Sequence, residues 1–193
     1  MRILRFPLVI IAAGLVAAAC PDLTTLEQQN PGQLDASGLY EPRNAQLLVN
    51  GVIADFECAF SRYVFGSAVF TDELTNSFAG SNNFDYDARR LPTNAGYGTA
   101  NCGTQQVASI YTPLSIARAD ADTVAARLET WSDADVANRQ KLLSQAYTYA
   151  GYSLVLLGEG MCTAAINVGP ELSSAQIFAE AKARFDKAAI AAT

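Results

Sequence analysis

The chain contains no histidine among its 193 residues. This absence excludes the serine-histidine-aspartate triad, the cysteine-histidine pair, and every zinc site or proton shuttle that depends on an imidazole ring. Basic residues are also scarce, because 13 lysines and arginines stand against 19 acidic residues and the formal net charge is -6. Nucleic-acid phosphates would repel such a chain, so binding of DNA or RNA is not expected.

Long hydrophobic runs are missing as well, and the longest one near the N-terminus is too short for a transmembrane helix. It covers residues 6–19, which is 14 residues, whereas a helix needs roughly 20 apolar residues to cross a bilayer. Arg2 and Arg5 precede the run, and small residues end it. This layout is typical of a secretory signal peptide, so we predict that residues 1–19 are removed during export.

Three alanines, residues 17–19, stand directly before Cys20. This junction resembles the bacterial lipobox, in which the cysteine sulfur receives a diacylglycerol and becomes the mature N-terminus. The resemblance implies that Cys20 is lipidated. It also implies an outer-membrane location, since Pro21 is not the aspartate of an inner-membrane retention sequence. The alternative is a plain secreted protein that is cut near Ala19.

Export places the remaining cysteines in an oxidising compartment. Cys58, Cys102 and Cys162 are an odd number, so at least one is left without a partner. Our preferred disulfide joins Cys58 to Cys102, because it would tie a predicted helix to a long loop rich in glycine and asparagine. The alternative is three free thiols. A catalytic thiol is not expected, because no histidine is present to activate it.

The hydrophobic pattern after residue 40 predicts an all-α domain over residues 41–193. Residues 20–40 carry two prolines after Cys20 and no sustained periodicity, which is typical of a tether to a lipid anchor. Apolar residues then recur three and four apart, and no alternating strand pattern of useful length follows. We predict four helices: one from Pro42 to about residue 71, one over residues 107–130, one from a capping box at Ser132 to about Gly158, and one from a capping box at Ser173.

Residues 71–106 interrupt this helical pattern with a long irregular loop insertion. A loop of this length inside a domain is usually functional or disordered. Aromatic rings beside amide and carboxylate groups can contact sugars or peptides. We therefore predict a ligand or partner contact surface at Phe84, Tyr86 and Tyr97. The alternative is that these rings pin the loop onto the domain.

The last two predicted helices resemble a tetratricopeptide (TPR) hairpin. Tyr147, a small pair at residues 150–151, and Leu154 fill the large, small and large positions of its first helix, while Ala181, Phe185 and Ala188 show the spacing of its second. The connection is 18 residues longer than in a standard unit. The lipobox cysteine, the tether and this TPR-like hairpin together are similar to the N-terminal part of the SusD/RagB family. Members of that family are outer-membrane lipoproteins that assist TonB-dependent transporters of the SusC type.

The resemblance implies a function in which the protein captures a nutrient, a glycan or an oligopeptide, for a SusC-type transporter, without catalysis and without a cofactor or metal. The alternative is a TPR-like accessory subunit that docks on a membrane protein complex and binds no small molecule. A carboxylate enzyme such as a glycosidase is a third hypothesis, which rests on four acidic pairs. These pairs are Asp72 and Glu73, Asp85 and Asp87, Asp120 and Asp122, and Asp133 and Asp135. We rank it lowest, because adjacent carboxylates on helix surfaces are ordinarily solvated.

Overall fold

The structure is a computed structural model that describes residues 36–77, 86–89, 102 and 109–193. The chain divides into two units, Met1–Gly38 and Leu39–Thr193. Only the beginning of the short helix α2 (Ala36–Leu39) is described in the first unit. The predicted signal peptide, the lipidated Cys20 and most of the predicted tether lie outside the described residues. The account below concerns the second unit.

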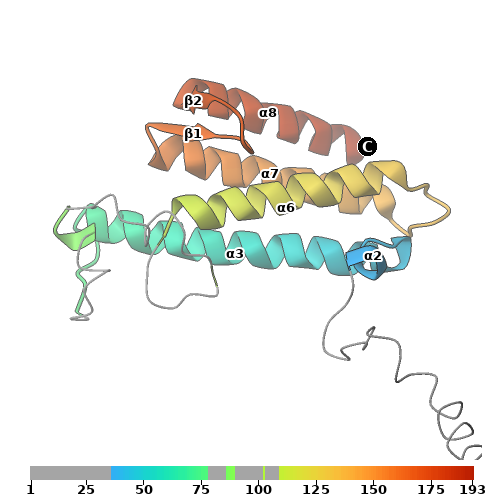
Figure 1. Ribbon diagram of the computed structural model, residues 1–193, viewed down its shortest axis with the longest axis horizontal. Helices are drawn as coiled ribbons and strands as arrows, with labels where there is room; N and C mark the ends of the chain where they lie inside the picture. Colours follow the sequence, from blue (N-terminus) through green and yellow to red (C-terminus); the bar gives the residue numbers. More distant parts are fainter. Residues whose placement is uncertain (1–35, 78–85, 90–101, 103–108) are drawn as a thin grey trace, which may run out of the picture. The chain divides into compact units, whose positions relative to one another are not determined.

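The described part of the second unit is mostly helical, as the all-α prediction requires. Its longer helices are α3 (Ala45–Phe70), α6 (Tyr111–Thr130), α7 (Arg139–Gly160) and α8 (Ser174–Ala191), and a short 3-10 helix η2 (Pro42–Asn44) leads into α3 (Figure 1). Within the described segments, no helix combines the length and the apolar composition needed to cross a membrane.

One predicted helix boundary is correct and another is wrong. Helix α8 begins at the predicted capping box, in which the Ser173 amide donates to Gln176 Oε1 at 2.9 Å. The predicted capping box at Ser132 does not start α7. Ser132 and Asp135 do bond reciprocally, but they close a turn, and Asn138 follows in the left-handed conformation at φ 56°. A left-handed residue interrupts a right-handed helix, so α7 begins only at Arg139.

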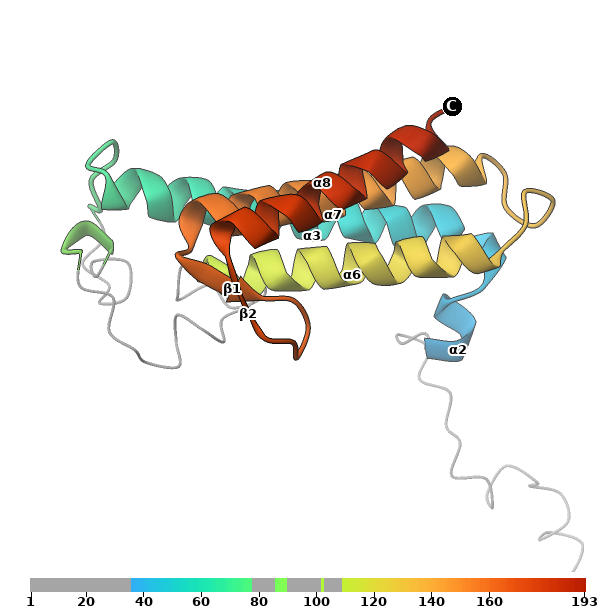
Figure 2. The same ribbon diagram turned by 90° about the horizontal axis from the view of Figure 1, so that it is seen from above.

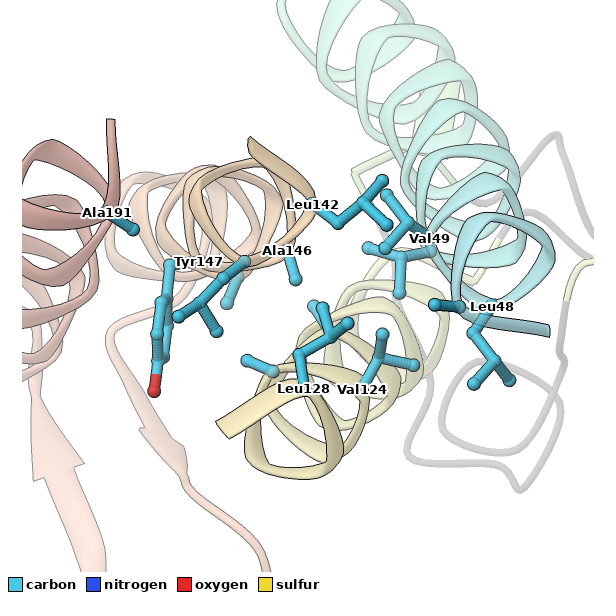
Figure 3. Packing of buried hydrophobic residues seen from close by; sticks show 14 of the residues in the cluster. Leu48, Val49, Val124, Leu128, Leu142, Ala146, Tyr147 and Ala191 are labelled. Atoms are coloured by element: carbon cyan, nitrogen blue, oxygen red, sulfur yellow. The ribbon is translucent and has the colours of Figure 1, made fainter. Parts of the chain in front are cut away.

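Consecutive long helices run in opposite directions, as the colour gradient shows in Figures 1 and 2. Helix α7 contacts each of the other three long helices, α3, α6 and α8. Figure 3 looks along the helices and shows α7, which carries Leu142 and Ala146, in a row between α8 and α3. Helix α6, which carries Val124 and Leu128, lies on one side of this row. The opposite side of α7 therefore faces away from α6.

The space between these helices is filled by aliphatic side chains. Leu114 and Leu128 of α6, Leu154 of α7 and Ile177 of α8 are all completely buried. Burial of one such side chain contributes about 1.5 to 3 kcal/mol to folding. Two clusters of this kind span the unit: one around Leu128 and Leu142, and one around Leu154 and Ile177. The predicted amphipathic helices thus owe their arrangement to burial of their apolar faces.

The long connection between α7 and α8 contains a small antiparallel sheet, which the sequence analysis did not predict. Strand β1 (Thr163–Ala165) pairs with β2 (Glu171–Ser173), and three-residue strands are too short to show an alternating pattern. Two contacts tie this hairpin to α6. The Ala165 amide donates to the Tyr111 hydroxyl at 3.2 Å, and Arg118 Nη1 donates to Asn167 Oδ1 at 2.9 Å.

The close approach of α8 to its neighbours yields a first prediction. Ala181 is 2% exposed and belongs to the buried cluster around Leu154 and Ile177. Replacing Ala181 with leucine should lower the free energy of unfolding by about 1 to 3 kcal/mol, because extra methylenes overpack a filled core. Ala183 lies on the same helix and is exposed, so Ala183→Leu is the matched control. Equal urea midpoints for the two variants would contradict this packing.

Candidate functional site

A continuous set of aromatic rings crosses α3, α7 and α8. The Phe56 ring lies 5.2 Å from Tyr149 and 5.9 Å from Tyr152, measured between ring centroids, and Tyr152 lies 5.3 Å from Phe185. Ring pairs at such distances attract each other beyond simple burial. We call this surface the aromatic face, and it consists of Phe56 and Phe60 of α3, Tyr149, Tyr152, Val155 and Leu156 of α7, and Phe185 of α8.

The aromatic face contains a groove of about 250 Å³ between α3 and α7. The side chains that line it are all aromatic or aliphatic: Phe56, Phe60, Tyr152, Val155 and Leu156. Two of them remain open to solvent, since Phe60 is 46% exposed and Tyr152 is 48% exposed. A concave apolar surface with exposed rings has the composition of a binding site.

Helical spacing and one glycine explain how the sequence builds this face. Phe56 and Phe60 are four residues apart on α3, so they share one side of the helix. On α8 the Phe185 ring lies directly over Gly151 of α7, and a Cβ atom at Gly151 would approach Phe185 Cε1 to 2.7 Å. The missing side chain at Gly151 therefore lets the ring come close to α7 and reach Tyr152.

Of the contact surface predicted in the long loop, the structure describes one residue, Tyr86. Phe84 and Tyr97 lie outside the described residues. Tyr86 is only 5% exposed and packs with Val69, Phe65 and Ile110, so the prediction of an exposed contact ring is wrong for Tyr86. Burial raises the pKa of Tyr86 to about 12. The Tyr86 ring therefore packs against the end of α3, as the alternative interpretation expects for this residue.

The structure joins Cys58 to Cys102 by a disulfide, the pair preferred from the sequence. Their Cα atoms are 6.1 Å apart, and the bond closes a span of 44 residues. It links α3 to the segment in which the glycine and asparagine content is highest. Cys162 is a free, exposed thiol after the end of α7.

The described members of the acidic pairs weighed for catalysis are not among the residues that line the groove. Asp72 and Asp133 each pair with an arginine, Arg89 and Arg139 respectively, and Asp135 bonds Ser132. Asp122 lies between two arginines, while Asp120 faces Asp55 of α3 instead. Asp85 is outside the described residues. Among the residues that the structure describes, no group of three or more acidic or cysteine side chains is placed to hold a metal ion.

The contact between Asp120 and Asp55 makes stability depend on pH. Burial and then the nearby Asp55 carboxylate raise the pKa of Asp120, against a smaller opposite effect of Arg118. A raised pKa in the folded state means that protonation favours folding, so this contribution is present below pH 3.8 and is lost as the pH rises through the raised value. Asp120→Asn should therefore stabilise the protein at pH 7, by about 0.2 to 1 kcal/mol for such a pair.

Urea unfolding of the wild type and of Asp120→Asn between pH 4 and pH 7 measures this effect. The advantage of the variant should shrink as the pH falls, because the wild-type carboxyl becomes neutral too. An advantage that stays constant over this range would show that the two carboxylates do not repel each other in the folded protein.

No known protein family, characterised protein or solved structure matches the chain. The aromatic face was also missed by the sequence analysis. Phe56 and Phe60 belong to the amphipathic pattern that predicts the first helix, and no sequence pattern marks Tyr149 or Tyr152 as a site. One signal was available on α3. This helix carries more large apolar residues than it buries, and Phe60, Val64 and Phe70 stay exposed.

Proposed function

We propose that the chain is an exported, lipid-anchored docking subunit of the SusD/RagB type, which works in nutrient uptake beside a TonB-dependent transporter of the SusC type. The aromatic face carries this proposal, because it offers an apolar groove between two long helices in which Phe60 and Tyr152 stay about half exposed. The proposal also includes lipidation at Cys20 and an outer-membrane location. Both rest on the lipobox-like junction before Cys20.

The packing of α7 against α8 supports the TPR-like part of the proposal. In such a hairpin, small residues of one helix receive large residues of the other. Phe185 lies over Gly151, and Phe178 lies over Gly158 with its Cε1 atom 2.8 Å from a Cβ atom built there. Ala181 is buried at the position that the TPR spacing assigns to a small residue. Helical hairpins of this kind commonly serve as surfaces for protein partners.

The lining of the groove favours a protein segment over a glycan as its occupant. A glycan needs hydrogen-bond partners for its hydroxyl groups, and the Tyr152 hydroxyl is the one side-chain polar group among the five lining residues. An apolar helix or loop needs none. Of the two functions inferred from the sequence, docking on a membrane protein complex therefore fits the groove better than direct capture of a sugar.

Affinity purification from solubilised outer membranes tests this function. The wild-type protein should recover a TonB-dependent barrel, and Phe60→Ala should reduce the recovery severalfold. Leu47→Ala is the matched control, because Leu47 lies on the same helix, is 53% exposed, and is rotated by about 140° from Phe60. Tight binding of an oligosaccharide that Phe60→Ala abolishes, without recovery of a barrel, would favour nutrient capture instead.

Mass spectrometry of the protein from its native membrane tests the anchor. We expect loss of residues 1–19 and a lipid adduct on Cys20. A mature N-terminus without lipid would contradict the membrane part of the proposal and leave the docking face to act in a secreted protein.

A further inference from the structure

The outward side of α7 carries a stripe with the spacing of a helix that packs against another helix. Its residues recur at intervals of three or four: Lys141, Gln145, Tyr149, Tyr152, Leu156 and Glu159. Such spacing places side chains along one seam. Helices α3 and α8 flank the stripe, because Phe56 packs against Tyr149 and Phe185 packs against Tyr152. The middle of the stripe lines the groove, where Tyr152 stays half exposed.

The two ends of this stripe carry opposite charges at equal distances from its centre. Lys141 and Glu159 are both exposed, and each is nine residues from Ala150. Lys141 makes no ion pair with the described residues. Glu159 interacts with Tyr63, and a carboxylate that accepts one hydrogen bond keeps lone pairs for others. If a second copy of the stripe lies antiparallel to the first, the basic end of each copy is beside the acidic end of the other.

These charges are also placed against the dipole of their own helix. A lysine in the first turn and a glutamate in the last turn each face the end of the dipole that has the same sign. Helix α7 has no acidic residue in its first turn and no basic residue in its last turn to compensate. The arrangement disfavours the isolated helix, and a partner that brings the opposite charge to each end would offset this cost.

We propose that the aromatic face docks on the same face of a second copy of this chain, with the two α7 helices antiparallel. This inference rests on the proposed function of the face as a docking surface, and it assigns the groove to a second copy instead of the transporter. Lys141 of each copy then meets Glu159 of the other, about 13 Å from the two-fold axis on either side. Tyr152 lies about 3 Å along the helix from the axis, so each ring reaches the groove of the partner copy.

Sedimentation equilibrium of the full mature chain in nonionic detergent tests this pairing. The wild type should form a dimer, and Lys141→Glu or Glu159→Lys should weaken dimerisation roughly tenfold or more, because each creates two like-charge contacts. The double charge reversal should restore the dimer. Both single changes complement the helix dipole, so α7 should remain folded. Arg43→Glu, which changes the net charge as Lys141→Glu does at an exposed site ahead of α3, is the control.

A monomeric wild type, or a dimer that is unaffected by both single reversals, would overturn the inference. If the protein is monomeric and Tyr152→Ala reduces recovery of the transporter barrel, the face docks on the transporter, and only the inference fails. If the charge-dependent dimer forms and no barrel is recovered, the inference stands and the proposed transporter partner is wrong.

Discussion

Replacing Cys58 and Cys102 together with serine is expected to lower the free energy of unfolding by about 4 kcal/mol. The disulfide closes a span of 44 residues, and its loss returns the conformational freedom of that span to the unfolded chain. A loss of this size is a large part of the stability of an ordinary domain. Urea or guanidinium unfolding, followed by circular dichroism, measures it directly.

Two comparisons separate this effect from a general effect of cysteine replacement. Cys162→Ser should leave the unfolding midpoint unchanged under oxidising conditions, because this thiol is free and exposed. Reduction of the wild type should bring its midpoint to that of the double variant. A double variant within about 1 kcal/mol of the wild type would contradict the stabilising role of the bond.

Asp122→Ala is the second replacement with a large expected effect, a loss of about 3 kcal/mol. The Asp122 carboxylate accepts one hydrogen bond from Arg118 at 3.3 Å and two from Nε and Nη2 of Arg184, each at 3.2 Å. It therefore joins α6 to α8. The Arg118 side chain is only 4% exposed. Removing its ion-pair partner leaves this buried positive charge with a hydrogen bond to Asn167 and with the nearby Asp120 carboxylate, and a poorly compensated buried charge strongly disfavours the folded state.

Asp186→Ala provides the matched control for this experiment. Asp186 also forms an ion pair, with Lys182 one helical turn earlier, but both side chains are more than half exposed. Exposed pairs of this kind contribute well under 1 kcal/mol. Similar losses for Asp122→Ala and Asp186→Ala would show that burial of Arg118 does not decide the effect.

The sequence predicts the helices because their periodicity is local information. Apolar residues three and four apart mark α3 and α7, and the capping box at Ser173 marks the start of α8 within one residue. The start of α7 was predicted too early, and the sequence pattern alone does not show why. Ser132 and Asp135 make the same bonds in a closed turn as in a helix cap, and only the left-handed Asn138 distinguishes the two.

The candidate site was harder to predict, because its residues meet only through tertiary packing. Phe56 and Tyr152 are nearly a hundred residues apart, and their contact depends on the placement of α3 beside α7. The contact surface was predicted in the long loop instead, because the aromatic and polar residues of the loop lie together in one segment of the sequence. Tyr86 shows the weakness of that inference, because composition does not reveal which ring turns inward.

Site-specific photocrosslinking in the native membrane tests the docking function of the aromatic face most directly. A photoreactive phenylalanine analogue at Phe60 should give discrete adducts with another protein, either the TonB-dependent barrel or a second copy of the chain. The same analogue at Leu47, which is equally exposed but points away from the groove, should give few or none. Absence of protein adducts at Phe60, or equal adducts at both positions, would contradict the assignment of this face as the docking surface.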